Sequence, residues 1–523
     1  MRRMRLLFFA LCLSAYYFCL PPAAAAQGVG LRQGPPNPTQ MHPPAKPGVP
    51  EKVPQKPGKP PVVTHHQIQV GGRTLSYTAT TGKLPIRNSD GVTEGHMFFV
   101  AYTLDNPPNP GRRPLTFAFN GGPGSASVWL HLGAIGPKRV DLLPNGKMPR
   151  PPFHLNDNQY TWLDMTDLVF IDPAGTGFSR VTKKEYGKDF WGVKGDIASV
   201  GEFIRLYLTR YQRWTSPLFL AGESYGTTRA AGLSGYLVDH GIALNGVVLI
   251  STVLNFETLL FTQGNDLPYA LYLPTFTATA WYHKKLAPDL EQSLDKTIDE
   301  VEQWAGTQYL QALAKGDKLT GQERADTIDH LARYTGLSKT YIDRSNLRVD
   351  AGHFRAELMR DQGVMVGRLD SRFTGYDHSG VAERPDYDPS EAAIRPPFTS
   401  TFGNYVRSEL GYQTDAVYYI LGGGFKQWDW GSAGRGFPQT FDPLRTAFVK
   451  NPYLKLYVAM GHFDMATPFF AVEYTLNHLD LPAALRSNIT TGYYNAGHMI
   501  YIRDKSLARL KQNIAGFMQS ALQ

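Results

Sequence analysis

The stretch LFLAGESYGTTRAAGLSGYL, residues 218–237, places a serine between two glycines where an apolar run gives way to an amphipathic pattern. The run LFLAG is short, almost wholly apolar and closed by glycine, which is typical of a strand buried on both faces. The residues that follow predict a helix. We therefore expect a strand, a sharp turn that carries Ser224, and a helix, in that order.

Other apolar runs repeat this pattern along the chain. They are LTFAFN (115–120), DLVFID (167–172), GVVLIS (246–251) and LKLYVAMG (454–461), with helical patterns such as residues 196–214 between them. Strands that alternate with helices predict a mostly parallel α/β sheet with helices on both faces. Ahead of these runs, HQIQVGGRTLSYTATTGKL (66–84) predicts a β-hairpin that turns at Gly71-Gly72. Ligands of such sheets bind beyond the carboxyl ends of the strands, where Ser224 is expected to lie.

The 523 residues divide by composition into five segments. Residues 1–26 have a basic start, an apolar stretch and an alanine-rich end, which predict a signal peptide cleaved just after Ala25 or Ala26; a retained membrane anchor is the alternative. Residues 27–63 are rich in proline and lysine and predict a disordered linker, or else a binding arm. Residues 64–255 and 401–523 are expected to form the α/β core, and residues 256–400 a mainly helical cap over the mouth of the active site.

Composition limits the classes of function. Hydrophobic residues make up 42% and charged residues 19% of the chain, as in an ordinary globular protein, and the net charge of +8 is spread out rather than massed, so nothing points to nucleic acid. Cys12 and Cys19 both lie in the signal segment, so the mature chain would have no disulfide, no cysteine-based metal site and no cysteine catalysis. No segment after the signal has the apolar length of a membrane span. The signal segment predicts export, to the periplasm or out of the cell.

Ser224 lies in the pattern Gly-x-Ser-x-Gly, which between a strand and a helix is typical of the nucleophile elbow of a hydrolase. Serine needs a histidine to take its proton and a carboxylate to orient that histidine, and in elbow hydrolases the carboxylate comes before the histidine in the chain. Asp464, just past a buried strand, and His498, in the segment 490–502, fit this order. His462 is the rival base, although it would precede the acid. On the residues alone, Asp464 could instead be a turn former and His498 a solvated side chain.

Backbone N–H groups are expected to bind the oxyanion of an acyl transfer. One would come from Tyr225, the residue after the serine, and the other from the glycine-rich loop NGGPG (120–124), which follows an apolar run. A plain Gly-Pro turn is the alternative reading of this loop, although such a turn needs fewer glycines.

Five segments together resemble the serine carboxypeptidase family. They are FNGGPGSAS (119–127), IDPAGTGFS (171–179), AGESYG (221–226), GHFD (461–464) and NAGHM (495–499), and they occur in the order of the family, with the helical insertion where the family has its cap. The resemblance implies an α/β-hydrolase fold. It also implies a serine-type carboxypeptidase that needs no metal or cofactor and acts on peptides with a free C-terminus.

The resemblance implies roles for seven residues. They are Ser224 as nucleophile, Asp464 as acid, His498 as base, Gly122 and Tyr225 as oxyanion donors, and Asn120 and Glu223 as the groups that bind the C-terminal carboxylate of the substrate. A glutamate and a carboxylate cannot share a tight site unless one is protonated, so this form of recognition favours mildly acidic pH. The alternative role for Glu223 is to brace the elbow.

The chain departs from the family at three places. Ser125-Ala126-Ser127 stands where the family usually has Cys-Ser-Ser, so that disulfide is missing, as we expect of a bacterial-type member. Ala134 stands where the family often has a second glutamate that shares a proton with the first, which leaves the exopeptidase specificity and the pH optimum open. His462 stands where the family often has the first aspartate of Gly-Asp-x-Asp.

Other readings stay open at this point. An esterase or acyltransferase would use the same catalytic groups, and a binding protein that had kept the fold would use none of them. The segments 398–413 and 425–431 either border the cleft or are ordinary packing, and the side-chain specificity and the oligomeric state are not readable from the sequence. Asn488 begins a glycosylation sequon, Asn-Ile-Thr, that counts only in a eukaryotic secretory pathway.

Overall fold

A computed structural model describes residues 60–431 and 436–523 of the chain. The predicted signal peptide (1–26) and almost all of the predicted linker (27–63) lie outside the described residues. Val62 and Val63, at the end of the predicted linker, already belong to strand β1 (Val62–Val70). Within the described ranges, no helix combines the length and the apolar character needed to cross a membrane.

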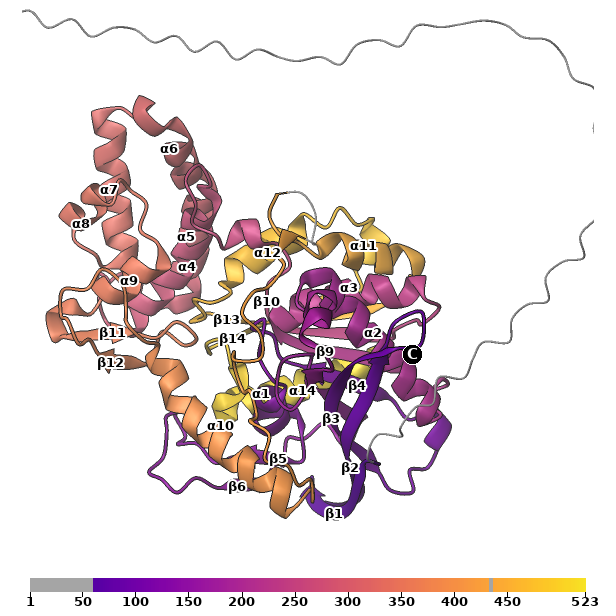
Figure 1. The fold of residues 1–523 in the computed structure, drawn as a ribbon. Helices are drawn as coiled ribbons and strands as arrows, with labels where there is room; N and C mark the ends of the chain where they lie inside the picture. Colours follow the sequence, from indigo (N-terminus) through magenta and orange to yellow (C-terminus); the bar gives the residue numbers. More distant parts are fainter. Residues whose placement is uncertain (1–59, 432–435) are drawn as a thin grey trace, which may run out of the picture. The chain divides into compact units, whose positions relative to one another are not determined.

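The centre of the fold is a ten-stranded sheet with the order β1-β2-β3-β7-β4-β9-β10-β13-β14, to which β8 is added by pairing with β3 (Figure 1). The pairs from β7 to β14 are parallel, and the pairs among β1, β2, β3, β7 and β8 are antiparallel. The strands not yet bounded are β2 (Arg73–Arg87), β3 (Thr93–Leu104), β4 (Leu115–Phe119), β7 (Asp167–Ile171), β8 (Arg180–Val181), β9 (Leu218–Ser224), β10 (Gly246–Thr252), β13 (Lys455–Gly461) and β14 (Ile489–Tyr494). The expected mostly parallel α/β sheet is therefore confirmed.

The strands form where the apolar runs predicted them. The runs at residues 115–120, 167–172, 217–222, 246–251 and 454–461 become β4, β7, β9, β10 and β13. The predicted hairpin is also present, since Val70 pairs with Arg73 across the turn Gly71-Gly72. Both glycines of that turn have positive φ, +56° and +75°, a region that glycine enters without steric cost.

Both faces of the parallel sheet are buried under helices, which is why its strands read as continuous apolar runs. On one face, Leu220 and Leu249 pack in a cluster with side chains of α2 (Val193–Arg210), α3 (Tyr225–Asp239) and α11 (Phe441–Lys450). On the other face, Ala221 and Val248 pack with side chains of α10 (Pro389–Ser408) and α14 (Asp504–Ala521). Successive residues of one strand thus contribute to different cores.

The strand order fixes where a ligand can enter. After β4 the chain continues to β7 on one side of it and later returns to β9 on the other side, so β4 and β9 flank a switch point in the sheet. Loops diverge at such a point and leave a crevice beyond the carboxyl ends of the strands. The loop 120–124 follows β4 and Ser224 ends β9, so both lie at this crevice.

The segment predicted as a cap is mainly helical and has a core of its own. It holds α4 (Leu267–Tyr282), α5 (Leu294–Trp304), α6 (Leu310–Lys315), α7 (Gly321–Thr335), α8 (Lys339–Arg344) and α9 (Ala351–Glu357). Phe276, Trp304 and Phe354 are among the side chains of its buried cluster. The boundary at residue 400 remains a prediction, and α10, which crosses it, packs Phe398 and Phe402 into the core of the sheet.

A few short elements complete the described chain. A hairpin of β11 (Val364–Val366) and β12 (Thr374–Tyr376) lies within the segment predicted as helical and has no counterpart in our sequence expectations. The remaining α-helices and β-strands are α1 (Val128–Leu130), β5 (Lys138–Val140), β6 (Leu155–Asp157), α12 (Phe469–Asn477) and α13 (Ala483–Arg486).

Asn488, the sequon residue, lies just before β14 and is buried. Its amide nitrogen donates to the carbonyl of Pro452 at 2.8 Å, and its amide oxygen accepts from Lys455 Nζ at 2.6 Å. A glycan on this nitrogen would have to break the first hydrogen bond and find space outside the fold.

Candidate active site

Ser224 stands at the turn between β9 and α3. The strand ends at Ser224 and the helix begins at Tyr225, so one passes directly into the other. The backbone of Ser224 has φ +60° and ψ −133°, a combination that costs energy for any residue with a side chain. This strained turn has the local geometry of a nucleophile elbow, which carries the serine hydroxyl beyond the end of the strand.

The glycines on either side of Ser224 are required by close backbone contacts. A Cβ atom at Gly222 would lie 2.3 Å from the carbonyl oxygen of Gly226, and one at Gly226 would lie 2.8 Å from the carbonyl oxygen of Phe119. Both distances are shorter than real Cβ contacts, and the obstructing atoms are backbone atoms that cannot turn aside. The first glycine of Gly-x-Ser-x-Gly is thus required by the packing of β9 against the start of α3, and the second by the approach of that helix to the end of β4.

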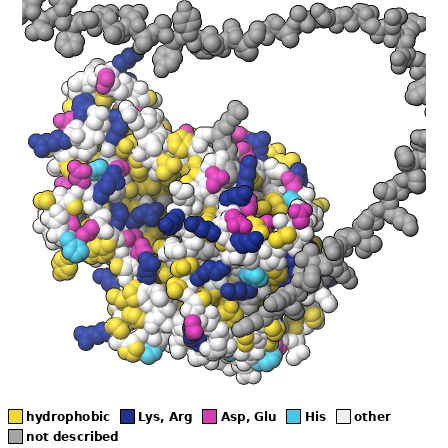
Figure 2. Space-filling model, in the orientation of Figure 1, with side chains coloured by type: hydrophobic (Ala, Val, Ile, Leu, Met, Phe, Trp, Pro, Cys, Tyr) yellow, Lys and Arg dark blue, Asp and Glu magenta, His cyan; other side chains and the backbone are white. Residues whose placement is uncertain are grey.

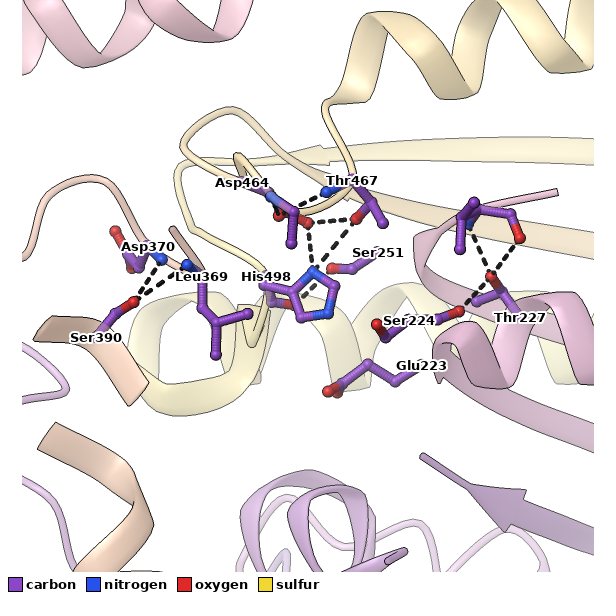
Figure 3. Close-up of polar contacts among 12 residues, drawn as sticks. Glu223, Ser224, Thr227, Ser251, Leu369, Asp370, Ser390, Asp464, Thr467 and His498 are labelled. Atoms are coloured by element: carbon purple, nitrogen blue, oxygen red, sulfur yellow. Dashed lines mark hydrogen bonds and ion pairs between the residues drawn. The ribbon is translucent and has the colours of Figure 1, made fainter. Parts of the chain in front are cut away.

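Asp464 is fully buried in the loop after β13, and both of its oxygens accept hydrogen bonds. Oδ1 accepts from the backbone N–H groups of Ala466 at 2.8 Å and Thr467 at 3.0 Å. Oδ2 accepts from the Thr467 hydroxyl at 2.6 Å and from Nδ1 of His498 at 2.7 Å (Figure 3). Because this carboxylate only accepts, the proton of the neutral imidazole lies on Nδ1, and Nε2 is left free to accept a proton.

His498 is held by its backbone as well as by its ring. Its N–H donates to the carbonyl of Leu369 at 2.6 Å, and its carbonyl accepts from the hydroxyl of Ser251 on β10. Figure 3 shows the imidazole between Asp464 and Ser224, with Nδ1 toward the carboxylate and the opposite edge toward the serine. Within the described residues no hydrogen bond joins the Ser224 hydroxyl to the ring, and such a bond is often long until a substrate is bound.

The charge of Asp464 sets the basicity of His498. Burial alone would lower the pKa of the imidazole, but the neighbouring carboxylate, through its charge and its hydrogen bond, outweighs burial and raises the pKa above its ordinary value of 6.5. Glu223 raises it further and Arg368 lowers it. His498 is therefore a stronger base than an isolated histidine, which suits a group that must take a proton from a hydroxyl.

His462, the alternative candidate for the base, does not lie between Asp464 and Ser224. Its ring packs against Phe469 and Tyr493, with centroids 5.1 Å and 6.0 Å away. Burial lowers the pKa of His462 to about 4, so the ring is neutral and a weak base at neutral pH. The aromatic packing explains a histidine at this position without a catalytic role.

The glycine-rich loop after β4 lies directly against the elbow. A Cβ atom at Gly121 would lie 2.3 Å from the backbone nitrogen of Tyr225 and 2.4 Å from that of Gly226. Gly122 and Gly124 both have φ +99°, which favours glycine. The N–H groups of Gly122 and Tyr225 thus belong to two segments in contact, the arrangement from which hydrolases build an oxyanion hole.

Asn120 and Glu223 form a buried, hydrogen-bonded pair next to the serine. Asn120 Nδ2 donates to Glu223 Oε1 at 3.0 Å, and Asn120 Oδ1 accepts from the N–H of Leu130 at 2.9 Å. The carbonyl of Asn120 accepts from Arg229, whose guanidinium is paired with the buried Asp196. These contacts fix the orientation of the amide and, through it, one oxygen of the glutamate.

Glu223 titrates well above an ordinary glutamate. Burial raises the pKa of its carboxyl to about 7, the nearby charge of His498 and the Tyr501 hydroxyl hold it down, and Asp464 raises it. The carboxyl is therefore largely protonated below pH 7. A neutral carboxylic acid can donate a hydrogen bond to an anion, whereas its ionised form repels one.

One of the two segments proposed to border the cleft lies beside the elbow. The indole rings of Trp428 and Trp430 have centroids 5.3 Å and 5.8 Å from the ring of Tyr225, both in edge-to-face contact. The other segment, residues 398–413, lies mainly in α10, where Phe398, Phe402 and Tyr405 pack against the sheet.

Several contacts at the site were missed by sequence reasoning. Thr467 had a local signal, since it follows Asp464 by three residues, the spacing at which a hydroxyl and an N–H can reach an aspartate. Leu369 contributes through its carbonyl, and Ser251 and Tyr501 through hydroxyls, from segments far apart in the chain. No pattern in the sequence marks such groups.

The described residues contain no group of three or more His, Cys, Asp or Glu side chains arranged to hold a metal ion. The site is instead made of one hydroxyl, one imidazole, one buried carboxylate and a protonatable glutamate.

Comparisons with known proteins show what the chain resembles. The model of the serine carboxypeptidase family matches residues 73–383, more than half of the chain. A retinoid-inducible serine carboxypeptidase of Mus musculus is 33% identical over 146 residues, which are 27% of this chain and 29% of that protein. Serine carboxypeptidase 24 of Arabidopsis thaliana is 20% identical over 422 residues, 80% of each chain.

A solved structure shows the fold. The prohormone-processing carboxypeptidase KEX1(delta)p of Saccharomyces cerevisiae superposes with a TM-score of 0.50 and 18% identity, over 84% of this chain and 91% of that one. The likeness confirms the expected α/β-hydrolase fold. The first curated relatives are matched over only about a third of their length or less, with shares of 32%, 29% and 22%.

Proposed function

The chain belongs to the serine carboxypeptidase family, and on that premise we propose that it is a serine-type carboxypeptidase, which hydrolyses the last peptide bond of substrates with a free C-terminus through an acyl-enzyme. The observation that carries the proposal is the 2.7 Å hydrogen bond between His498 and Asp464, with the imidazole facing Ser224 at the elbow (Figure 3). A hydroxyl, an imidazole and a buried carboxylate in this order form the Ser-His-Asp arrangement that performs acyl transfer through serine.

The first half of the proposed reaction forms the acyl-enzyme. Ser224 Oγ attacks the carbonyl carbon of the last peptide bond while Nε2 of His498 takes the hydroxyl proton. The N–H groups of Gly122 and Tyr225 bind the negative charge that develops on the carbonyl oxygen. Asp464 keeps the other proton on Nδ1 and stabilises the imidazolium.

The second half releases both products. The imidazolium gives its proton to the leaving amino group, the C–N bond breaks, and the C-terminal amino acid departs. Water then attacks the ester of Ser224 while His498 takes one of its protons. Collapse of the second tetrahedral intermediate returns the proton to Ser224 Oγ and frees the shortened peptide.

Asn120 and Glu223 are proposed to bind the C-terminal carboxylate of the substrate. The amide nitrogen of Asn120 and the protonated carboxyl of Glu223 both supply N–H or O–H donors, and their 3.0 Å hydrogen bond joins them into one unit next to the nucleophile. An anchor for the terminal carboxylate beside the serine would limit cleavage to the last peptide bond.

A pair of matched peptides tests this proposal directly. An N-blocked dipeptide with a free C-terminus should release its C-terminal amino acid, and the same dipeptide with a C-terminal amide should be cleaved much more slowly. An enzyme that hydrolyses esters but does not distinguish the free acid from the amide would instead be an esterase or acyltransferase on the same scaffold.

The pH profile should depend on whether the substrate carries a carboxylate. Glu223 is neutral below its pKa of about 7 and negative above it, so kcat/KM for the free-acid peptide should fall as the pH rises through 7, mainly because KM increases. An ester without a free carboxylate should keep only the acid limb, from protonation of His498, at a higher pH than an ordinary histidine would give. Steady-state kinetics on both substrates from pH 4 to 9 measures this.

Glu223→Gln is the matched variant for the alkaline limb. Glutamine stays neutral at every pH, so the fall above pH 7 should disappear while the acid limb remains. The charges of Glu223 and His498 interact, so the acid and alkaline limbs of the pH profile belong to the pair and not to one residue. The difference between the profiles of the wild type and Glu223→Gln is therefore more informative than the apparent pKa of either limb. Equal alkaline limbs for acid and ester substrates would contradict carboxylate recognition by Glu223.

Export is proposed from residues 1–26 alone, and it implies a periplasmic or secreted enzyme. N-terminal sequencing of the protein recovered from its source tests this, since the mature chain should begin after Ala25 or Ala26 and an intact Met1 would contradict cleavage.

A further inference from the structure

The family resemblance predicts a second glutamate, paired with Glu223, at the position where this chain has Ala134. The segment His131–Ile135 is buried throughout, and the methyl group of Ala134 has no exposed surface. A methyl group cannot share a proton with a glutamate or bind an anion. If the terminal carboxylate of a peptide is bound by Asn120 and Glu223, a third polar group is needed to take the place of that glutamate.

Tyr501 lies where such a group is needed. It lies three residues after His498 in the turn Ile500–Ile502, it is fully buried, and its ring fills the space beside Gly133. A Cβ atom at Gly133 would lie 2.4 Å from Tyr501 Cε2, so only glycine leaves room for this ring next to Ala134. The carbonyl of Tyr501 also accepts a hydrogen bond from Arg139 at 3.2 Å, which anchors the turn.

Two buried polar atoms meet there without a hydrogen bond. Oε2 of Glu223 and the hydroxyl of Tyr501 are both buried, and neither has a hydrogen-bond partner in the described part of the chain. They are nevertheless close enough for a weak hydrogen-bonding interaction, through which the phenol lowers the pKa of the Glu223 carboxyl and that carboxyl in turn raises the pKa of Tyr501. A buried polar atom left unpaired costs about 1–3 kcal/mol, so two of them side by side point to a ligand that would satisfy both.

We propose that Tyr501 donates its hydroxyl hydrogen to the C-terminal carboxylate of the peptide substrate, next to Asn120 and Glu223, and so determines the preference for a free C-terminus. The proposal rests on the carboxypeptidase function above. The burial of Tyr501 keeps the phenol neutral and protonated across the working pH range, because it raises the pKa well above 10. Only the proton on Glu223 then has to be present for the site to bind the terminal carboxylate.

Arg368 is the other group near the site that could meet a carboxylate. It is exposed, it influences the pKa of His498, and within the described residues its guanidinium makes no hydrogen bond or ion pair. Glu223, in contrast, changes charge near pH 7. Arg368→Gln therefore serves as a competing variant in the experiment that tests Tyr501.

The experiment compares Tyr501→Phe with Tyr77→Phe. Tyr77, on β2, is also fully buried, and its hydroxyl has no hydrogen-bond partner among residues 60–431 and 436–523, so its variant makes the same chemical change away from the site. For each protein, kinetics at pH 5.5 are measured on an N-blocked dipeptide and on a matched ester without a free carboxylate. Thermal melting checks that each variant is folded.

The expected result is specific to one substrate and one variant. Tyr501→Phe should raise KM for the free-acid peptide roughly 10- to 100-fold, the range for loss of a hydrogen bond to a charged group, with little change in kcat or in the ester kinetics. Tyr77→Phe should match the wild type on both substrates.

Three outcomes would overturn the inference, each in a recognisable way. If Tyr501→Phe keeps the wild-type KM at pH 5.5 and changes only the alkaline limb of the pH profile, the phenol adjusts the pKa of Glu223 and does not contact the substrate. If Arg368→Gln raises KM for the free acid and Tyr501→Phe does not, the carboxylate is bound by the arginine. If the wild type itself does not prefer the free acid over the amide, the proposed function fails, and the role of Tyr501 fails with it.

Discussion

Replacing Ser224 by alanine is expected to lower kcat on a blocked dipeptide by about a millionfold, to the rate that the rest of the site sustains alone. The reason is that Ser224 is the hydroxyl carried by the elbow, whereas the hydroxyl of Thr227, further along α3, donates to the carbonyl of Ser224 at 2.6 Å. The measurement is single-substrate kinetics with an enzyme preparation free of wild-type protein, because a trace of wild type would mask the loss.

Ser234→Ala is the matched control for this loss. Ser234 is buried on the same helix, α3, and its hydroxyl donates to the carbonyl of Ala231 at 2.7 Å, away from the elbow. This variant should keep the wild-type kcat and KM. Peptide hydrolysis by Ser224→Ala within about tenfold of the wild type would rule out an acyl-enzyme at this residue.

Replacing Asp464 by asparagine is expected to reduce kcat by about 10⁴-fold, on both peptide and ester substrates. Oδ1 accepts from two backbone N–H groups, so the oxygen of an asparagine must take that place, and its NH₂ group must then face His498 Nδ1. An NH₂ in that position forces the ring proton onto Nε2. The imidazole then has no lone pair toward Ser224, although the side chain has kept its shape.

Thr467→Val separates the tautomer effect from a general disturbance of the loop. It removes the hydroxyl that donates to Asp464 Oδ2 at 2.6 Å and lies 3.3 Å from His498 Nδ1, but it leaves the carboxylate in place. We expect a loss of about tenfold in kcat, the cost of one hydrogen bond to a charged acceptor. Equal losses of kcat in Thr467→Val and Asp464→Asn would show that a disturbed loop, and not the wrong tautomer of His498, causes the loss.

Local patterns in the sequence were enough to predict the long strands of the sheet and the turn that carries Ser224. A buried parallel strand must be apolar on both faces, so the apolar run 246–251 predicts β10 directly. Gly222 is required by a contact with the carbonyl of Gly226, four residues along the chain. Features of this kind depend on residues that are close in the chain, so they can be predicted from one sequence.

The remaining parts of the site depend on contacts between distant segments. The choice between His462 and His498 rests on which ring lies against aromatic side chains and which lies against Asp464, and spacing alone does not decide it. Likewise Tyr501 meets Glu223 only because β9 and the turn after β14 end at the same edge of the sheet. The hairpin of β11 and β12 was missed because strands of three residues are too short to show a period.

The most direct test of the account is to trap the covalent intermediate and locate it. The wild-type enzyme would be treated with a fluorophosphonate, digested, and analysed by mass spectrometry, with Asp464→Asn and Ser224→Ala treated in parallel. We predict one adduct per chain, on the peptide that contains Ser224, with slow labelling of Asp464→Asn and none of Ser224→Ala. A full adduct on any other residue, or undiminished peptide hydrolysis by enzyme whose Ser224 is fully labelled, would contradict the account.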